Sequence, residues 1–211
     1  MIDLEILLDK VSIHIGDLSS FAMENAKHFK LIAWDIETSG LDWKRDVIGT
    51  CQIYFPDSQV HIVQINNTTP SHLKELLNDS GICKLFHHAM FDLRFMVSYW
   101  SIEVHNVACT KIASKILTPS MENHSLKNII KKYLGITLDK MLQTSNWLES
   151  DLSKEQINYA VRDVIYLPEL FKILKQKLLF KERWALAEAC FSYLPVKAKL
   201  DILGIKDVFA Y

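Results

Sequence analysis

The run from Leu31 to Trp34, followed by Asp35 and Glu37, places the strongest constraint on how this chain folds. Apolar residues stand at both odd and even positions, which is the pattern of a central strand covered on both sides. Side chains two positions apart in a strand point the same way, so Asp35 and Glu37 face one point in space. Two such carboxylates stay ionised only beside strong positive charge, which a divalent cation supplies. The alternative is a strand that ends at the surface with solvated acids, where residues 38–40 turn the chain.

The chain has 211 residues, which suits one domain with a full-sized core, and we expect residues 1–211 to form a single domain. Its net charge of −1 does not predict a polyanionic partner for the molecule as a whole. Between residues 111 and 140, however, six lysines outnumber two acids and leave a charge of +4. The lysines are Lys111, Lys115, Lys127, Lys131, Lys132 and Lys140, and the acids are Glu122 and Asp139. A solvated helix face explains this excess about as readily as a groove that follows phosphates.

The four cysteines, at positions 51, 83, 109 and 190, are widely spaced and include no CxxC pair. This usage predicts free, mostly buried thiols in a reducing cytosol, and therefore a cytoplasmic protein. The opening stretch MIDLEILLDKVSIHIGD carries acids and lacks the basic start of a secretory signal. No uncharged apolar stretch is long enough to span a membrane, so we expect no membrane association.

The order of predicted elements places strands early and helices late. The predicted strands are 11–15, 31–37, 47–54, 59–65, 82–86 and 102–107. The predicted helices are one from residue 71, then 91–100, 109–117, 125–134, 153–176, 179–191 and 194–203. Ser153 and Gln156 predict a helix N-cap, and Gly135 predicts the end of the helix before it. The pattern indicates one α/β domain with an antiparallel hairpin region, later parallel strands and a helical C-terminal half.

Three further residues could complete an acidic site. Asp92 lies in the first turn of an apolar helix, where an acid also complements the helix dipole without any further role. Tyr159 and Asp163 are one turn apart and share a helix face that we expect to turn inward. Near Asp92, His87 fits a structural hydrogen-bonding role better than a metal-binding one, whereas His88 could contact a substrate.

The ordered set of D-x-E on a strand, an Asp opening a later helix, and Y-x-x-x-D on a late helix resembles the DEDD superfamily of 3′-to-5′ exonucleases. Asp35 and Glu37 match the first motif, Asp92 the second, and Tyr159 and Asp163 the third. The histidine class of this superfamily would carry His where Asn158 stands, so the resemblance is to the tyrosine class. The stretch LDKMLQTSNWLESDLSKEQINYAVRDVIYL is similar to ribonuclease D.

Three further stretches narrow the resemblance to the short nano-RNase C group: CTKIASKIL, NHSLKNI and the tail from residue 189 to 211. The resemblance covers nearly the whole chain from about Ile15 onward. It implies a ribonuclease H-like mixed sheet flanked by helices, with no C-terminal accessory domain. It also implies degradation of very short RNAs, and a ring-like homo-oligomer larger than a dimer. The many apolar residues of the tail agree with an interface, although the tail could instead fold back onto its own core.

The resemblance implies a site with two divalent cations, Mg²⁺ or Mn²⁺. Asp35 would bridge both ions, Glu37 and Asp163 would hold the ion that activates water, and Asp92 would hold the other mainly through water. Tyr159 would position the attacking water and could help to take its proton, although a pKa of about 10 makes a free tyrosine a poor base unaided. Oxygen ligands suit Mg²⁺ or Mn²⁺ rather than zinc.

For substrate binding, Thr38 would contact the terminal ribose, Leu41 would insert between the last two bases, and His88 would contact the RNA substrate. Stacking on apolar surface does not depend on base identity, so broad sequence tolerance follows.

Three functions remain open at this stage. The first is a metal-dependent 3′-to-5′ exoribonuclease that hydrolyses short RNA, possibly dinucleotides, to nucleoside 5′-monophosphates. The second is the same chemistry on tRNA 3′ ends or single-stranded DNA. The third is a non-catalytic nucleic-acid-binding protein on the same fold, which the presence of all five catalytic-type residues disfavours.

Overall fold

A computed structural model describes residues 10–56, 59–66, 68–138, 145–205 and 207–210. Its centre is a six-stranded mixed sheet in the order β1-β4-β3-β2-β5-β6. The strands are β1 (Val11–Ile15), β2 (Leu31–Thr38), β3 (Ile48–Tyr54), β4 (Val60–Gln64), β5 (Cys83–Phe86) and β6 (Val107–Cys109). β3 pairs antiparallel with both β2 and β4. The other pairs are parallel: β1 with β4, β5 with β2, and β6 with β5.

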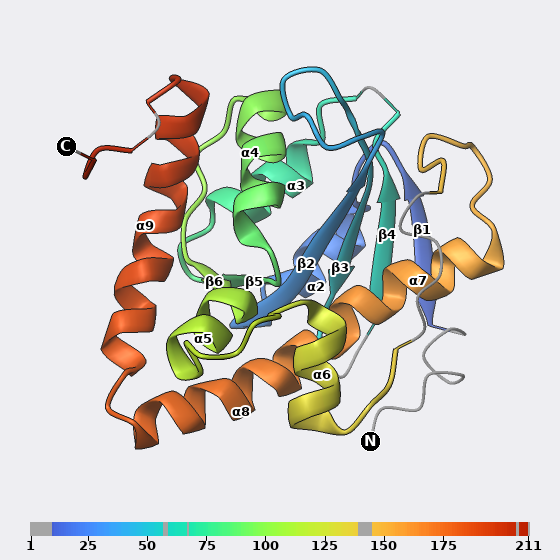
Figure 1. The fold of residues 1–211 in the computed structure, drawn as a ribbon. Helices are drawn as coiled ribbons and strands as arrows, with labels where there is room; N and C mark the ends of the chain where they lie inside the picture. Colours follow the sequence, from blue (N-terminus) through green and yellow to red (C-terminus); the bar gives the residue numbers. More distant parts are fainter. Residues whose placement is uncertain (1–9, 57–58, 67, 139–144, 206, 211) are drawn as a thin grey trace.

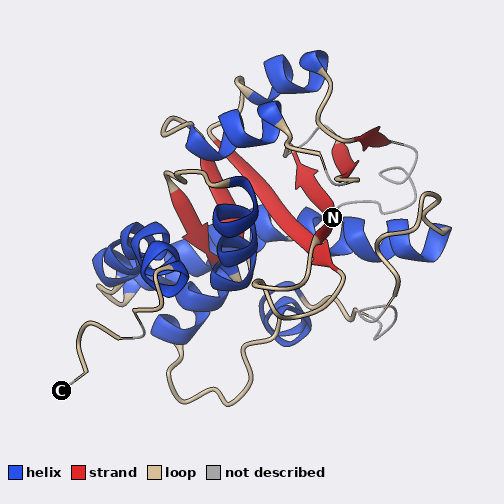
Figure 2. Ribbon diagram, turned by 90° about the horizontal axis from the view of Figure 1, so that it is seen from above, coloured by secondary structure: helices blue, strands red, loops and turns tan. Residues whose placement is uncertain are grey.

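Helices cover both faces of this sheet (Figure 2). They are α2 (Ser20–Ala26), α3 (Ser71–Asn78), α4 (Ala89–Trp100), α5 (Thr110–Leu117), α6 (Leu126–Leu134), α7 (Lys154–Ile165), α8 (Leu167–Phe180) and α9 (Trp184–Ile202). The orange-to-red helices α7, α8 and α9 run along the lower right, the bottom and the left of the molecule (Figure 1). The predicted ribonuclease H-like mixed sheet with a helical C-terminal half is therefore confirmed.

The central strand is buried as its sequence predicts. Ile32, Ala33 and Trp34 have no exposed surface, and β2 lies between β3 and β5. The predicted caps are also present: Ser153 and Gln156 form a capping box at the start of α7, and Gly135 closes α6 with a φ of 71°.

Several predicted elements are wrong in extent. The strand expected over 102–107 is a loop up to Asn106, whose φ of 49° is left-handed, and β6 begins only at Val107. The helix expected over 153–176 is divided at Tyr166, because Pro168 lacks the amide that would continue the hydrogen-bond ladder. Conversely, the two helices expected over 179–191 and 194–203 are one helix, α9, which continues through Pro195.

The packing of α9 explains its continuity. It lies against α4 and β6, and Arg94 of α4 forms an ion pair with Asp201 near its end, with an Nη2–Oδ2 distance of 2.6 Å. α2 was not predicted, although Ser19 caps it by accepting a hydrogen bond from the amide of Ala22. α4 begins at Ala89, two residues earlier than predicted, and Asp92 lies in its first turn as expected.

The apolar tail is divided between core and surface. Phe191 and Leu194 are buried, which agrees with a tail that folds back. Other large apolar side chains remain exposed, namely Val196, Leu203, Ile205, Val208 and Phe209, while Tyr211 lies outside the described residues.

The remaining surface and composition predictions have mixed outcomes. All four cysteines are free, with Cys51 and Cys109 buried, Cys83 partly buried and Cys190 exposed. Lys115, Lys131 and Lys132 are exposed on α5 and α6, whereas Asp139 and Lys140 lie outside the described residues. In the part of the chain that the structure describes, no helix is both long and apolar enough for a membrane span.

Candidate active site

Three of the four predicted acids meet at one point. Asp35 and Glu37 project from the same face of β2, and Asp163 reaches them from α7, which packs against β2 and β3. One carboxylate oxygen from each of the three lies within 4.8 Å of the others. All three residues are largely buried, with part of their surface still exposed.

Asp92 stands beside this trio at the start of α4, and its side chain is only 2% exposed. The main-chain amides of Ile36 and of Asp92 itself donate to its carboxylate, while its buried Oδ1 has no hydrogen-bond partner among the described residues. Its charge acts on both Asp35 and Glu37. The four acids thus form one electrostatic unit, with Asp92 at its edge.

Burial raises the pKa of every carboxyl in this unit, and repulsion from other acids adds to the effect at Asp35, Glu37 and Asp92. Burial, followed by the charges of the other three acids, raises the pKa of Asp35 well above its usual value. Burial, followed by the charges of Asp163 and Asp92, raises the pKa of Glu37 to about 9. Burial raises the pKa of Asp92 to about 7 and that of Asp163 to about 7. Four such groups hold negative charge at neutral pH only with a positive partner, so the donor set fits one or more hard divalent cations.

Tyr159 lies one turn before Asp163 and its hydroxyl hydrogen-bonds to the Asp163 carboxylate. Burial and then the charges of Asp163, Glu37 and Asp35 raise the pKa of Tyr159 above its usual value. The phenol is therefore protonated at neutral pH and can donate a hydrogen bond.

The predicted substrate-contacting residues lie at the end of β2, in the turn after it and at the start of α4. Thr38 is its last residue, and its hydroxyl donates to the carbonyl oxygen of Gly40 at 2.6 Å. Leu41 is 84% exposed in the turn that follows. His88 occupies the N-cap position of α4 with its ring stacked on Phe91 at a centroid distance of 6.3 Å.

His87 has the structural role that the sequence suggested. Its Nδ1 lies 2.9 Å from Oγ1 of Thr110, and burial lowers its pKa to about 3, so the ring is neutral. Trp147 also lies beside the site, although no motif singled it out: its buried ring is 5.9 Å from that of Tyr159. An aromatic residue within a polar loop just before the cap of α7 was the available signal.

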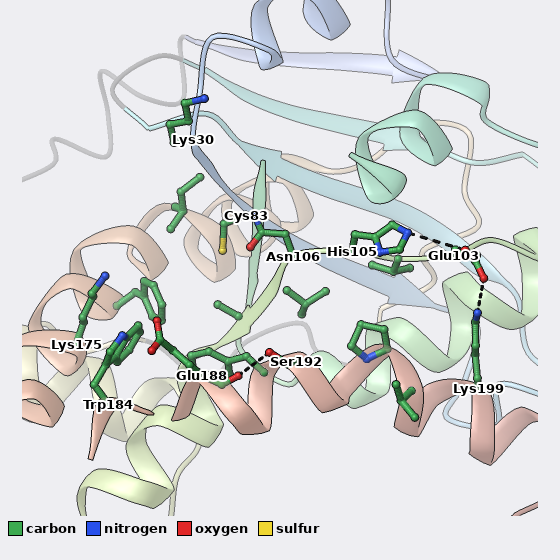
Figure 3. A pocket seen from close by; sticks show the side chains of 18 residues that line it. Lys30, Cys83, Glu103, His105, Asn106, Lys175, Trp184, Glu188, Ser192 and Lys199 are labelled. Atoms are coloured by element: carbon green, nitrogen blue, oxygen red, sulfur yellow. Dashed lines mark hydrogen bonds and ion pairs between the residues drawn. The ribbon is translucent and has the colours of Figure 1, made fainter. Parts of the chain in front are cut away.

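A hollow of about 690 Å³ lies elsewhere, at the amino ends of β2, β5 and β6 against α9 (Figure 3). Glu103 there is already paired with Lys199, and Lys175 lies over the Trp184 ring, 4.7 Å from its centroid. The acid cluster toward the carboxyl end of β2 does not line this hollow. The hollow is therefore separate from the candidate active site.

Comparison with known proteins identifies the family of the chain. The model of the 3′-5′ exonuclease family, which is named after the exonuclease domain of DNA polymerase A, matches residues 12–179. The chain belongs to this 3′-5′ exonuclease family. It is 35% identical over 158 residues to DNA polymerase I of Aquifex aeolicus, and 29% identical over 166 residues to ribonuclease D of Desulfotalea psychrophila. Each match covers 74% of this chain, but the chain spans only 25% and 44% of these two relatives.

Among solved structures, Brucella melitensis NrnC has a TM-score of 0.89 and 34% sequence identity, with 96% of this chain and 99% of that chain covered. Ribonuclease D of Escherichia coli has a TM-score of 0.72 at 22% identity over 95% of this chain and 52% of that chain, which shows a shared fold. The resemblance to ribonuclease D-like exonucleases of the nano-RNase C kind is thereby confirmed.

Proposed function

We propose that this chain is a metal-dependent 3′-to-5′ exoribonuclease that hydrolyses short RNA oligonucleotides to nucleoside 5′-monophosphates. The observation that carries the proposal is the meeting of Asp35, Glu37 and Asp163 within 4.8 Å, in a chain of the 3′-5′ exonuclease family. In the reaction, a water oxygen bonds to the terminal phosphorus and the bond from phosphorus to the 3′ oxygen breaks. The products are a nucleoside 5′-monophosphate and a strand with a new 3′-hydroxyl.

The four carboxylates Asp35, Glu37, Asp92 and Asp163 would hold two divalent cations, Mg²⁺ or Mn²⁺. Such ions supply the positive charge that lowers the pKa of water and offsets the charge of the scissile phosphate. The raised carboxyl pKa values support this assignment, since they reflect a cluster whose charges are not compensated within the protein. A structure of Brucella melitensis NrnC with bound Mg²⁺ supports the choice of metal.

Tyr159 would orient the attacking water through its hydroxyl. A raised pKa fits this role, because a protonated phenol donates a directed hydrogen bond and accepts another. With a cation held by the Asp163 carboxylate, the Tyr159 hydroxyl would be free to hydrogen-bond to the attacking water. Tyr159 then contributes orientation, and not proton removal.

Substrate contacts would come from the end of β2 and the start of α4. The exposed Leu41 side chain would stack between the two terminal bases of the RNA. Thr38 would contact the terminal ribose, and His88 would contact the RNA strand. Structural support for a short substrate is that Brucella melitensis NrnC has been solved bound to pGG.

We further propose that residues 1–211 act as one exonuclease domain and assemble into a homo-oligomer larger than a dimer. The support is the exposed apolar set that ends the chain, of which Leu203 and Phe209 are each 72% exposed. Subunits that close around the active sites would admit short strands and exclude long ones. The cytoplasmic location stays a prediction, which the four free thiols support.

Digestion of 5′-labelled RNAs from two to about twenty nucleotides, with Mg²⁺, Mn²⁺ or EDTA, tests the proposal. We expect metal-dependent release of nucleoside monophosphates from the 3′ end, fastest for the shortest strands. Turnover of single-stranded DNA or of tRNA 3′ ends as fast as that of short RNA would instead support the second function, the same chemistry on those substrates. Binding of RNA without turnover in either metal would contradict the enzymatic proposal.

A further inference from the structure

A short loop before α7, residues 146–150, is fastened to the sheet and to the helix. From β4, the buried Gln64 donates through Nε2 to the carbonyl oxygens of Glu149 at 2.9 Å and Ser150 at 3.1 Å. From α7, the buried Gln156 donates through Nε2 to the carbonyl oxygen of Asn146 at 3.0 Å. These buried side-chain amides hold the loop from two separate elements, so its position is determined by the core.

A third attachment is the direct approach of the loop to β3 at Gly49. The register of β2 and β3 shifts here, since Glu37 pairs with Thr50 while Thr38 pairs with Ile48, which leaves Gly49 as the extra residue of a β-bulge. A Cβ atom at Gly49 would lie 2.5 Å from the carbonyl oxygen of Trp147 and 3.0 Å from its Cβ. The missing side chain is what lets the main chain of Trp147 lie on the strand.

The side chain that this arrangement places is the indole of Trp147. It is 2% exposed, and its ring centroid lies 5.9 Å from that of Tyr159, with 45° between the ring planes. Its Nε1 is buried and has no hydrogen-bond partner among the described residues. No hydrogen bond to these residues therefore holds the indole in place, and leaving its buried N–H group unpaired costs free energy. Packing of the indole against the Tyr159 ring is the contact that explains the position of Trp147.

We propose that Trp147 is a positioning residue for Tyr159, and that Gly49 sets the position of Trp147. The indole forms the wall that confines the phenol ring, so that the hydroxyl points at Asp163 and the acid cluster. This inference rests on the proposed function, because it acts through the role of Tyr159 in catalysis. It adds a chain of contacts from the bulge in β3, through residues 146–150, to the catalytic hydroxyl.

The test is a double-mutant cycle measured as kcat and KM on a short labelled RNA. Trp147→Phe and Gly49→Ala are each made in the wild-type chain and in the Tyr159→Phe chain. Trp184→Phe is the matched control, since Trp184 packs against Phe171 and Phe191 beside the hollow of Figure 3 and not against the acid cluster. Thermal unfolding of each variant identifies loss of folding as a cause.

We expect Trp147→Phe and Gly49→Ala each to lower kcat by about 10-fold or more with KM nearly unchanged, because misplacement by about 1 Å can cost about 100-fold. In the Tyr159→Phe chain the same changes should cost less than about twofold, since the hydroxyl they position is absent. Trp184→Phe should leave kcat within about twofold at a comparable loss of stability.

Equal losses of kcat in both backgrounds would overturn the inference and assign Trp147 to general packing. So would an equal fall in kcat for Trp184→Phe at the same loss of stability. A Tyr159→Phe chain with full activity would instead show that the proposed role of Tyr159 is wrong, and the inference would fall with it. The two failures are therefore distinguishable.

Discussion

Replacing Asp163 by Asn tests whether the acid cluster is destabilising until a cation binds. Asn keeps the shape and a hydrogen-bond acceptor for Tyr159 but removes one negative charge from the unit. Burial raises the pKa of Asp163 from 3.8 to about 7, so the folded chain holds a proton there that the unfolded chain releases at lower pH. Stability from this group is full below the unfolded pKa and is lost as the pH rises through about 7.

The size of the effect follows from that shift. At about 1.4 kcal/mol per pKa unit, a rise from 3.8 to about 7 corresponds to a cost of about 4 kcal/mol for the metal-free protein above pH 7. Neighbouring carboxyls take up protons and water enters as the charge forms, so we expect the variant to recover about 1–3 kcal/mol of this cost.

Urea denaturation followed by tryptophan fluorescence, in EDTA and across the pH range, measures this free energy of unfolding. The gain of Asp163→Asn over wild type should be small near pH 4 and level off above about pH 7. Added Mg²⁺ or Mn²⁺ should stabilise the wild type at high pH and the variant far less.

Asp201→Asn is the matched control, because Arg94 and Lys197 pair with Asp201 and hold its pKa below the usual value. That change should lower the stability above the usual carboxyl pKa, with or without metal. An Asp163→Asn variant no more stable than the wild type in EDTA above pH 7 would refute the reasoning.

Three further predictions concern catalysis and assembly. Asp35→Asn should lower the rate of hydrolysis by more than about 100-fold and raise thermal stability in EDTA, since even indirect changes at metal sites cost about 10–100-fold. A variant that keeps a tenth of the wild-type rate would contradict the two-ion assignment. Tyr159→Phe should lower kcat strongly with little change in metal or RNA affinity, and a parallel fall in affinity would make Tyr159 a binding residue. Light scattering at micromolar concentration should give a mass above that of a dimer, and cleavage of RNAs of two to four nucleotides should far outpace cleavage of a twenty-nucleotide RNA. A monomer that trims both equally would contradict this prediction.

Two pairs of candidate site residues could be predicted to share a face from local geometry, while their union into one site came from the family resemblance. Asp35 and Glu37 share a face because strand geometry repeats every two residues, and Tyr159 and Asp163 share one because a helix repeats near every four. The burial of β2 followed equally from its unbroken apolar run. Caps such as Ser153 with Gln156 are also local, and they appeared where the sequence placed them.

Tertiary structure alone decided how distant segments meet. α9 continues through Pro195 because packing on α4 and β6 outweighs the lost hydrogen bond, which no local rule for proline predicts. The meeting of Gly49 with Trp147 joins residues almost a hundred positions apart, and nothing near either one in the chain specifies it. Periodicity therefore determined which faces carry the acids, while long-range packing determined which segments surround them, because packing depends on how side-chain volumes fit across the whole core.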